Sequence, residues 1–309
     1  MAGLFLFGRI APTHSFGHIG DMQESNKENY VLIAQALEED LGPDCFDATT
    51  MALASETCGT AQLRTREPCR VAGVELAREV FHYVNEQLAV EIVLPDGSAA
   101  QPGDTLLTIS GKVTSILTAE RTALNFLQRL CGVATLTRRF VEAANRPDVA
   151  LLDTRKTTPG WRALEKAAVL CGGGVNHRVG LYDAIMIKDN HIALWGGGSM
   201  AEAVKIARVR FPELKIEVEV DTLEQLKVVL PAEPDWVLLD NMTPETLKEA
   251  VKLCEGRCQT EASGGITLET IGAIAATGVD AVSVGALTHS APSIDLGLDV
   301  DNVIPSRRG

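Results

Sequence analysis

The sequence lacks the features of several large classes of protein. Aromatic residues make up only 5% of its 309 residues, and 41 acidic against 28 basic residues give a formal net charge of −13. Binding of nucleic acid without sequence preference depends on clustered positive charge, so this composition argues against it. No uncharged apolar run approaches the roughly 18 residues that a membrane helix needs. We therefore expect a soluble globular protein that binds neither nucleic acid nor a membrane.

Cysteine is present but without a metal-binding or disulfide pattern. The seven cysteines are odd in number and scattered, and Cys254 and Cys258, four apart, have no histidine nearby, so a zinc site is not expected. Unpaired thiols are typical of a reducing compartment, which predicts a cytoplasmic location. Residues 1–27 show no signal-peptide pattern and are interpreted as a leader.

The second half of the chain alternates short apolar runs with helical stretches. Six runs, each ending in polar or charged residues, predict strands at 149–153, 184–188, 216–220, 236–240, 259–263 and 281–285. Helices are predicted between most of them, at 199–210, 222–230, 244–255 and 267–276. This alternation predicts a parallel sheet. Because no Rossmann glycine pattern is present, a complete or partial α/β barrel is favoured over an open doubly wound sheet.

The first half has a mixed α/β pattern. A helix is predicted over 29–40, ended by Gly42 and Pro43. Runs with strand character follow at 61–63, 69–74, 89–94 and 105–109, separated by Pro- and Gly-containing turns. Residues 75–87 are predicted to be helical, and 113–144 a long amphipathic helix interrupted near Gly132.

Positively charged residues gather where the predicted strands end, which is where barrels place their catalytic groups. Between residues 121 and 190 there are 11 basic and 6 acidic residues, a local excess within an acidic protein. Such a cluster concentrates small anions, and arginine suits a carboxylate because its planar group donates two parallel hydrogen bonds. The candidates for binding a ligand with more than one negative group are Arg155, Lys156, His177, Arg178 and Lys188.

Two carboxylates and two glycine turns complete the predicted site. Glu219 and Asp240 end neighbouring strands and could bind Mg²⁺, directly or through water, or accept hydrogen bonds from sugar hydroxyls. Their alternative role is ion pairing with nearby cations. Ser263-Gly264-Gly265 and Val284-Gly285-Ala286 follow the last two strands, where barrels bind phosphate through backbone N–H groups. These residues predict a ligand that is anionic at one end, hydroxylated in the middle and phosphorylated at the other end.

Other reaction classes have less support. The sequence contains no Ser-His-Asp elbow, Walker loop or His-Glu-x-x-His helix, so hydrolase and P-loop functions are not indicated. Lys188, on an apolar strand, leaves an aldolase-like lyase with a Schiff-base lysine as an alternative. The density of cations favours anion binding instead, and a Schiff base does not need paired carboxylates with two phosphate loops.

The chain resembles the quinolinate phosphoribosyltransferase family in a series of ordered motifs, over about residues 28 to 300. They are ALEEDLGPDCFDATT (36–50), AERTALNFLQRLCGVATLT (119–137), DTRKTTPG (153–160), GGGVNHRVGLYDAIMIKDNHI (172–192), EVEVD (217–221), LLDN (238–241), EASGGI (261–266) and SVGALTHSAPSIDL (283–296). The departures are small: Cys45-Phe46 stands where a small or acidic residue is expected.

The resemblance implies a pentosyltransferase of NAD biosynthesis. Its reaction joins quinolinate and phosphoribosyl pyrophosphate, with Mg²⁺, to give nicotinate mononucleotide, CO₂ and pyrophosphate. It also implies an N-terminal α/β sandwich domain (28–130, to which residues 290–309 return) and an open, TIM-like α/β barrel (131–289). A homodimer or higher homo-oligomer is expected.

The resemblance further assigns roles to single residues. Arg155, His177, Arg178 and Lys188 bind the quinolinate carboxylates, with Arg121 from a second subunit, and Thr154 is a further substrate-binding residue. Lys156 lies between the two substrates, and Glu219 and Asp240 serve the ribose and the metal. Ser263, Gly264, Gly265, Val284, Gly285 and Ala286 bind phosphate, with His289 as a further neighbour. Lys156, Lys188, Glu219 and Asp240 are the residues expected to be catalytic.

Three alternatives within or near the family stay open at this point. The scaffold could act on another acceptor, as in a homologue associated with molybdenum transport, or transfer phosphoribose to nicotinate without decarboxylation. A catalytically inactive scaffold protein is disfavoured because every expected charged position is filled.

Arg121 lies close to the apolar stripe of its predicted helix, so we expect its side chain near the buried side of that helix. A buried cation needs a partner, and the alternative role of Arg121 is therefore an ion pair with Glu120 or Glu142.

Overall fold

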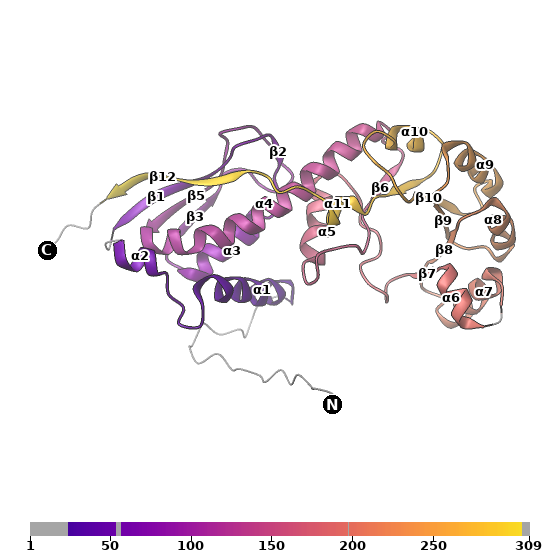
Figure 1. The fold of residues 1–309 in the computed structure, drawn as a ribbon, viewed down its shortest axis with the longest axis horizontal. Helices are drawn as coiled ribbons and strands as arrows, with labels where there is room; N and C mark the ends of the chain where they lie inside the picture. Colours follow the sequence, from indigo (N-terminus) through magenta and orange to yellow (C-terminus); the bar gives the residue numbers. More distant parts are fainter. Residues whose placement is uncertain (1–23, 54–56, 197, 305–309) are drawn as a thin grey trace, which may run out of the picture. The chain divides into compact units, whose positions relative to one another are not determined.

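Figure 1 shows the fold in a computed structural model, which describes residues 24–53, 57–196 and 198–304. The chain divides into two compact units, residues 1–46 and 47–309. In the first unit, α1 (Glu24–Leu41) contains the predicted helix and begins earlier, so residues 24–27 of the predicted leader are helical. The rest of that leader lies outside the described residues.

The second unit begins with α2 (Ala48–Leu53) and an antiparallel sheet. The sheet has the order β12-β1-β5-β3, formed by β12 (Leu296–Ile304), β1 (Cys58–Thr65), β5 (Thr105–Lys112) and β3 (Ala89–Ile92). Every second residue of β1 is buried, as expected for a strand with one face on a core. The last strand in the chain, β12, pairs along the whole of β1, so the C-terminal segment belongs to this sheet. A two-stranded ladder, β2 (Cys69–Arg70) with β4 (Ala99–Ala100), lies nearby in the sequence.

Two helices accompany this sheet. The shorter, α3 (Val74–Val84), packs on α4 (Val113–Ala144), and the fully buried Phe81 and Phe126 come from these two helices. The predicted interruption of the long helix near Gly132 is wrong, because α4 is continuous through that residue. Gly132 is instead a point of close approach: a Cβ atom there would lie 2.0 Å from the carbonyl oxygen of Pro292.

The remaining strands form one parallel sheet of six. Its order is β6-β11-β10-β9-β8-β7, formed by β6 (Ala150–Leu152), β11 (Ala281–Ser283), β10 (Gln259–Ser263), β9 (Trp236–Asp240), β8 (Ile216–Val220) and β7 (Ile185–Ile187). All six predicted strands are therefore confirmed. Between β6 and β7, the first and last strands in this order, no ladder is formed within the described residues, as expected for the predicted open barrel.

Helices connect these strands along the outer side of the sheet (Figure 1). They are α5 (Arg162–Cys171), α6 (Asp189–Trp195), α7 (Met200–Arg210), α8 (Leu223–Val229), α9 (Pro244–Cys254), α10 (Ile271–Ala275) and α11 (Ala286–His289), with a 3₁₀ turn at Leu230–Ala232. The predicted helices at 199–210, 222–230 and 244–255 are confirmed within one residue at each end, and that at 267–276 is shorter. None of the described helices is long and apolar enough to cross a membrane.

Alternation along the strands divides apolar from charged residues. In β8, Ile216, Val218 and Val220 are fully buried, whereas Glu217 and Glu219 share the opposite face.

The predicted domain boundaries at 27/28, 130/131 and 289/290 stay predictions; the second of them falls inside α4.

Candidate active site

The ends of β8, β9 and β10 bring polar side chains to one edge of the parallel sheet. Ser263 at the end of β10 is in register with Asp240 at the end of β9, and β8 places Glu219 beside β9. The hydroxyl groups of Ser263 and Ser283, from β10 and β11, are 3.0 Å apart. The predicted strand-end residues are therefore neighbours in space because parallel strands end at a common edge.

Lys188 and Glu219 form an ion pair at this edge, with the lysine Nζ donating to Glu219 Oε2. The ion-pairing role left open for the two carboxylates is thus realised by Glu219 in the structure. Asp240 is different: its Oδ2 accepts from Asn241 Nδ2 at 2.6 Å, and no cation within salt-bridge distance belongs to the described residues. Burial, followed by the charges of Glu219 and Asp221, raises the pKa of Asp240.

This group of carboxylates fits a divalent cation. The charges of Glu219 and Asp221 both act on Asp240, and Lys188 opposes their effect. Carboxylate oxygens are the donors that Mg²⁺ prefers, and a bound cation would oppose the burial and the repulsion that together raise the pKa of Asp240. The chemistry of these donors suits the expected metal, whose binding here stays a prediction.

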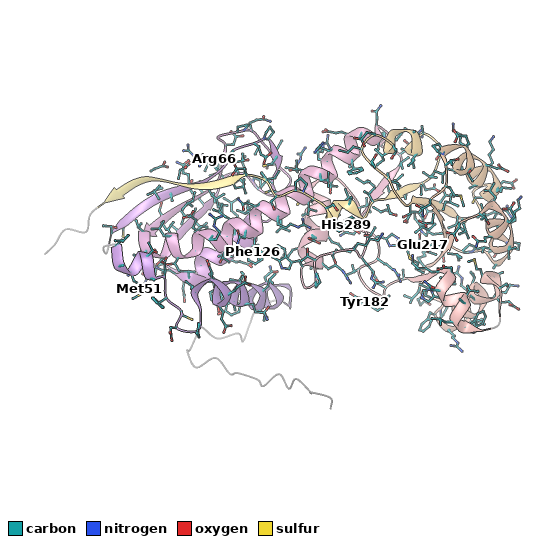
Figure 2. The ribbon with its side chains drawn as sticks, viewed as in Figure 1. Met51, Arg66, Phe126, Tyr182, Glu217 and His289 are labelled. Atoms are coloured by element: carbon teal, nitrogen blue, oxygen red, sulfur yellow. The ribbon has the colours of Figure 1, made fainter. Side chains whose placement is uncertain are left out.

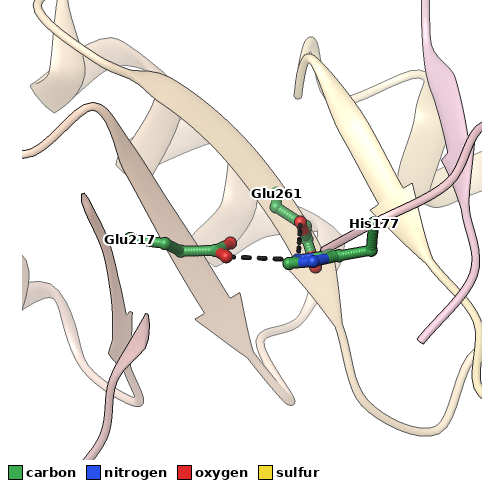
Figure 3. Close-up of side chains that lie close together, drawn as sticks. All are labelled: His177, Glu217 and Glu261. Carbon is green, nitrogen blue, oxygen red and sulfur yellow. Dashed lines mark ion pairs between the residues drawn. The ribbon is translucent and has the colours of Figure 1, made fainter. Parts of the chain in front are cut away.

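A second, deeper cluster joins His177 to two carboxylates that the sequence analysis did not single out (Figure 3). The His177 Nε2 atom is 3.1 Å from Glu217 Oε2 and 3.3 Å from Glu261 Oε2. Both glutamates are buried, and their Oε1 atoms have no hydrogen-bond partner among the described residues. Glu217 lies two residues before Glu219 on β8, and Glu261 two before Ser263 on β10, so the cluster forms the layer beneath the strand-end residues.

The cluster holds a proton on His177. Burial lowers the pKa of the imidazole, but the hydrogen bonds to Glu217 and Glu261 outweigh burial and raise this pKa to about 10. The Nδ1 atom lies 2.7 Å from the backbone nitrogen of Arg178. The three ligand atoms lie within 4.8 Å of one another, as in a metal site. Because Nε2 is at hydrogen-bond distance from both carboxylates, a shared proton accounts for the geometry.

A buried ion pair holds the loop that carries His177. Lys166 Nζ donates to Asp153 Oδ1 and, at 2.9 Å, to the carbonyl oxygen of His177. Asp153 Oδ1 also accepts the backbone N–H of His177 at 2.9 Å, and the amide of Asn176, in the orientation its neighbours require, donates to Asp153 Oδ2 at 2.7 Å. The side chains of Lys166 and Asp153 are 3% and 0% exposed. The first residue of the DTRKTTPG motif therefore acts structurally.

Arg155 and Arg178 lie close enough to influence each other. Burial lowers the pKa of Arg178, the charge of Arg155 lowers it further, and Glu217 and Asp183 act in the opposite sense. Arg178 Nη1 donates to the carbonyl oxygen of Ala184 at 3.1 Å. The buried Nε of Arg155 has no partner among the described residues. Neither guanidinium group forms an ion pair with a carboxylate of the described residues, an arrangement that suits the binding of an anion.

The two glycine turns border the site from the side of β10 and β11. Gly264 has a φ of 93°, and a Cβ atom there would lie 2.2 Å from Asn241 Oδ1. A Cβ atom on Gly285 would lie 3.0 Å from Lys156 Cδ and 3.2 Å from His289 Nε2. Lys156, exposed on its loop, and His289 therefore both lie against the turn formed by Val284, Gly285 and Ala286.

Arg121 does not lie where its helical position predicted. It is exposed, because the buried face of α4 is formed by Ile116, Ala119, Ala123 and Leu127. Within the part of the chain that the structure describes, it forms no ion pair with Glu120 or Glu142; Glu142 instead pairs with Arg138. The expectation of a partly buried arginine was wrong, since the stripe that includes Leu117 is not the centre of the buried face.

Comparison with known proteins shows which family has this sequence and this fold. Two family models match the chain: the quinolinate phosphoribosyl transferase N-terminal domain over residues 47–131 and the C-terminal domain over residues 133–299. The chain belongs to the quinolinate phosphoribosyltransferase family. Its activity is phosphoribosyl transfer to quinolinate with decarboxylation, a pentosyltransferase reaction of NAD biosynthesis, which confirms the function that the motifs implied.

Similar proteins of this family cover nearly the whole chain. A nicotinate-nucleotide pyrophosphorylase [carboxylating] from Mycobacterium leprae is 43% identical over 275 residues, 87% of this chain and 95% of its own. A probable enzyme of the same name from Bacillus subtilis is 42% identical over 263 residues, 85% of this chain and 90% of its own. The solved nicotinate-nucleotide pyrophosphorylase from Francisella tularensis is 39% identical, with a TM-score of 0.85, over 93% of this chain and 100% of its own.

Sequence reasoning about this family member missed several buried ionic residues. Glu217 and Glu261 stand on apolar strands at the positions two before predicted site residues, a spacing that places both on the inner face. Glu165 and Lys166 interrupt the apolar face of α5, and both are buried. The sequence did contain one signal for these buried ionic residues: each is a charged residue at a position where the periodic pattern predicts an apolar one.

Proposed function

We propose that quinolinate binds with its two carboxylates between Arg155 and Arg178, with Lys188, His177 and Thr154 at the borders of the same site. The observation that carries this proposal is the pair of partly buried guanidinium groups that form no ion pair among the described residues. A dicarboxylate would satisfy both groups through charge-assisted hydrogen bonds. His177 is already engaged at Nε2 by Glu217 and Glu261, so its contribution would come from the positive charge of the ring.

The phosphoribosyl pyrophosphate would lie across the ends of β8 to β11. Backbone N–H groups at Ser263-Gly264-Gly265 and Val284-Gly285-Ala286 supply neutral donors for phosphate oxygens. Lys156, whose side-chain Cδ atom lies beside Gly285, supplies a positive charge, and His289 borders the same turn. Glu219 and Asp240 face the middle of the site, where they would accept hydrogen bonds from the ribose or hold Mg²⁺. An ion held there would supply positive charge that stabilises the leaving pyrophosphate.

The charges of the chain explain the two chemical steps. In the first, the ring nitrogen of quinolinate attacks the anomeric carbon, the bond to pyrophosphate breaks, and its electron pair leaves with the pyrophosphate. Lys156 and Lys188 stabilise this departing charge without transferring a proton. In the second step, the bond between the ring and the adjacent carboxylate breaks. The electron pair is accepted by the ring, which carries a positive charge after alkylation; CO₂ leaves and a proton takes its place.

The lyase alternative that Lys188 left open has no support in the geometry. The Nζ atom of Lys188 donates to Glu219, whereas a Schiff-base lysine needs a free and uncharged amine. An ammonium group at the border of the quinolinate site suits anion binding and charge stabilisation. The same residue therefore fits the transferase assignment.

We further propose that the active unit is a homodimer in which Arg121 completes the site of the other subunit. The exposure of Arg121, together with the absence of an intramolecular ion pair within the described residues, supports this assignment. Large apolar side chains are also exposed on the segment 179–195, next to Arg178: Val179, Leu181, Tyr182, Leu194 and Trp195, with Tyr182 75% exposed (Figure 2). Such a patch is typical of a protein interface.

We also propose a cytoplasmic location, because all seven cysteines are free thiols and free thiols are typical of a reducing compartment.

The experiment that tests this proposal compares quinolinate with nicotinate, a pyridine with one carboxylate. We expect turnover with quinolinate and phosphoribosyl pyrophosphate, measured as CO₂ and mononucleotide, and little with nicotinate. Replacement of Arg178 by Gln should raise KM for quinolinate about 10- to 100-fold, the effect of one charge-assisted hydrogen bond, while KM for phosphoribosyl pyrophosphate changes little. An unchanged KM for quinolinate in this variant would show that the dicarboxylate binds elsewhere.

A further inference from the structure

Arg129 and Glu165 form a buried ion pair outside the predicted substrate site. Arg129 lies on α4 and Glu165 on α5; the glutamate side chain is 0% exposed and the arginine side chain 22%. The guanidinium Nε and Nη2 atoms donate to Glu165 Oε1 at 3.1 Å and 2.8 Å. A buried carboxylate needs several donors to offset its loss of hydration, and here the arginine supplies only part of them.

The other donors to Glu165 come from the loop that carries Arg155 and Lys156. The backbone N–H of Thr158 donates to Glu165 Oε2 at 3.0 Å, and its hydroxyl donates to Oε1 at 2.8 Å. The loop is thereby fixed to α5 at a point two residues beyond Lys156. Near the start of the same helix, Arg162 Nε donates to the Thr157 hydroxyl at 3.0 Å.

The remaining donors of Arg129 reach a different segment, the one that follows β11. Its Nη1 donates to the carbonyl oxygen of Ala291 at 2.8 Å, and its Nη2 to that of Thr288. The guanidinium group is planar and rigid, so these directions are fixed relative to the bonds to Glu165. One turn along α4, Gly132 lets the backbone at Pro292 approach the helix. The loop that carries Lys156 and the segment that follows the 284–286 turn are therefore both attached to one ion pair.

The two attached loops meet at Lys156. The Thr288 hydroxyl donates to the carbonyl oxygen of Lys156 at 2.7 Å, and the aliphatic part of the Lys156 side chain lies beside Gly285. Neither Arg129 nor Glu165 is among the residues assigned to a substrate. Their contacts determine where the Lys156 backbone lies relative to the turn at 284–286.

We propose that Arg129 and Glu165 are positioning residues that hold Lys156 and the 284–286 turn in register, so that a phosphate group meets the lysine and the backbone N–H groups together. The inference rests on the proposed roles of Lys156 and of this turn. A purely structural ion pair would lower stability when disturbed. A positioning pair must in addition change the affinity for phosphoribosyl pyrophosphate more than that for quinolinate.

The test removes single hydroxyl groups and leaves the ion pair intact. Thr158→Val deletes one hydrogen bond to Glu165, and Thr288→Val deletes the bond to the Lys156 carbonyl; valine has nearly the same shape as threonine. Thr288→Val should raise KM for phosphoribosyl pyrophosphate about fivefold, as expected for one neutral hydrogen bond, and Thr158→Val, which loses a bond to a charged carboxylate, about tenfold or more. The change in KM for quinolinate should be smaller in both variants. Thr158→Ser and Thr288→Ser retain the hydroxyl and should restore the wild-type KM.

Glu142→Gln serves as the matched control. It breaks an exposed ion pair on the same helix, in which Arg138 Nε donates to Glu142 Oε1 at 2.6 Å, and should leave both KM values unchanged. If the two valine variants lower the melting temperature but leave both KM values at the wild-type level, the ion pair only supports the fold and the inference is wrong. Equal increases in the two KM values would also overturn it.

The Lys156→Ala variant separates failure of this inference from failure of the proposed function. If Lys156→Ala leaves KM for phosphoribosyl pyrophosphate unchanged, the assigned role of Lys156 is wrong, and with it the basis of the inference. If Lys156→Ala raises that KM while the valine variants do not, the site assignment holds and only the positioning role of Arg129 and Glu165 is refuted.

Discussion

Removing the buried cation Lys166 should destabilise the protein and disturb the loop that carries His177. In Lys166→Met the aliphatic volume is largely kept, but Asp153, which is 0% exposed, loses its ion-pair partner. Breaking a buried ion pair from one side costs about 3–5 kcal/mol. Asp153 keeps the N–H donors of His177 and Asn176, so we expect the lower part of this range, about 3 kcal/mol in the free energy of unfolding.

The effect should depend on pH with a defined sign. Burial, the largest influence, raises the pKa of Asp153 above its ordinary value of 3.8, whereas Lys166 lowers it. Removing Lys166 therefore raises the folded-state pKa further, and the native state holds a proton that the unfolded chain releases. Stability is then lost as the pH rises from 3.8 through the folded-state pKa, and the penalty of the substitution is smaller in acid.

The assay is urea denaturation of the wild type and Lys166→Met at pH 5 and pH 8, at one protein concentration. Arg138→Gln, which breaks an exposed ion pair, is the control, for which a loss of about 0–1 kcal/mol is expected. A loss in Lys166→Met no larger than that of the control would refute the reasoning. A penalty that grows toward acid pH would show that the ionised form of Asp153 is not the source of the instability.

Three further results are expected. Gly264→Ala should raise KM for phosphoribosyl pyrophosphate and cost on the order of 1–3 kcal/mol of stability, because its φ is 93° and a Cβ would lie 2.2 Å from Asn241 Oδ1; normal kinetics and stability would contradict this. Asp240→Asn should weaken the dependence of turnover on Mg²⁺ while leaving the affinity for quinolinate intact, as titrations of each ligand would show. Inactive Arg121→Ala and Lys188→Ala chains, mixed in equal amounts, should regain about a quarter of wild-type activity, since half of the dimers are mixed and each has one intact site. No recovery after verified subunit exchange would place Arg121 in its own chain's site or in none.

Short-range patterns were enough to predict the parallel sheet and several of its helices. The runs at 216–220, 236–240 and 259–263 coincide with β8, β9 and β10, because an apolar run of strand length between helical segments has few other structures available. The long helix was also predicted, but its interruption at Gly132 was not found. Glycine lowers helix propensity locally, whereas here it is required by the approach of Pro292, which lies 160 residues further along the chain.

In the site, too, the sequence predicts the order of the polar residues but not their individual contacts. The order of polar residues at the strand ends, from Lys188 through Glu219 and Asp240 to Ser263, is a property of the sequence, and parallel strands bring them to one edge whatever the details of packing. Whether Glu219 is paired with Lys188, and whether Arg121 faces the core or solvent, depends on side-chain directions that periodicity does not resolve.

Only the tertiary structure revealed the buried charges that support the site. Arg129 and Glu165 are 36 residues apart, and Lys166 and Asp153 are 13 apart; nothing in their local sequence indicates that each pair meets. Glu217 and Glu261 are brought to His177 from two strands and a loop. The physical reason is that burial decides the partner of an ionised group: an exposed charge is solvated by water, but a buried one requires another part of the chain beside it. The sequence by itself therefore determined the elements and the polar residues at their ends, and the packing of α4 and α5 against the loops decided which charges hold those residues in place.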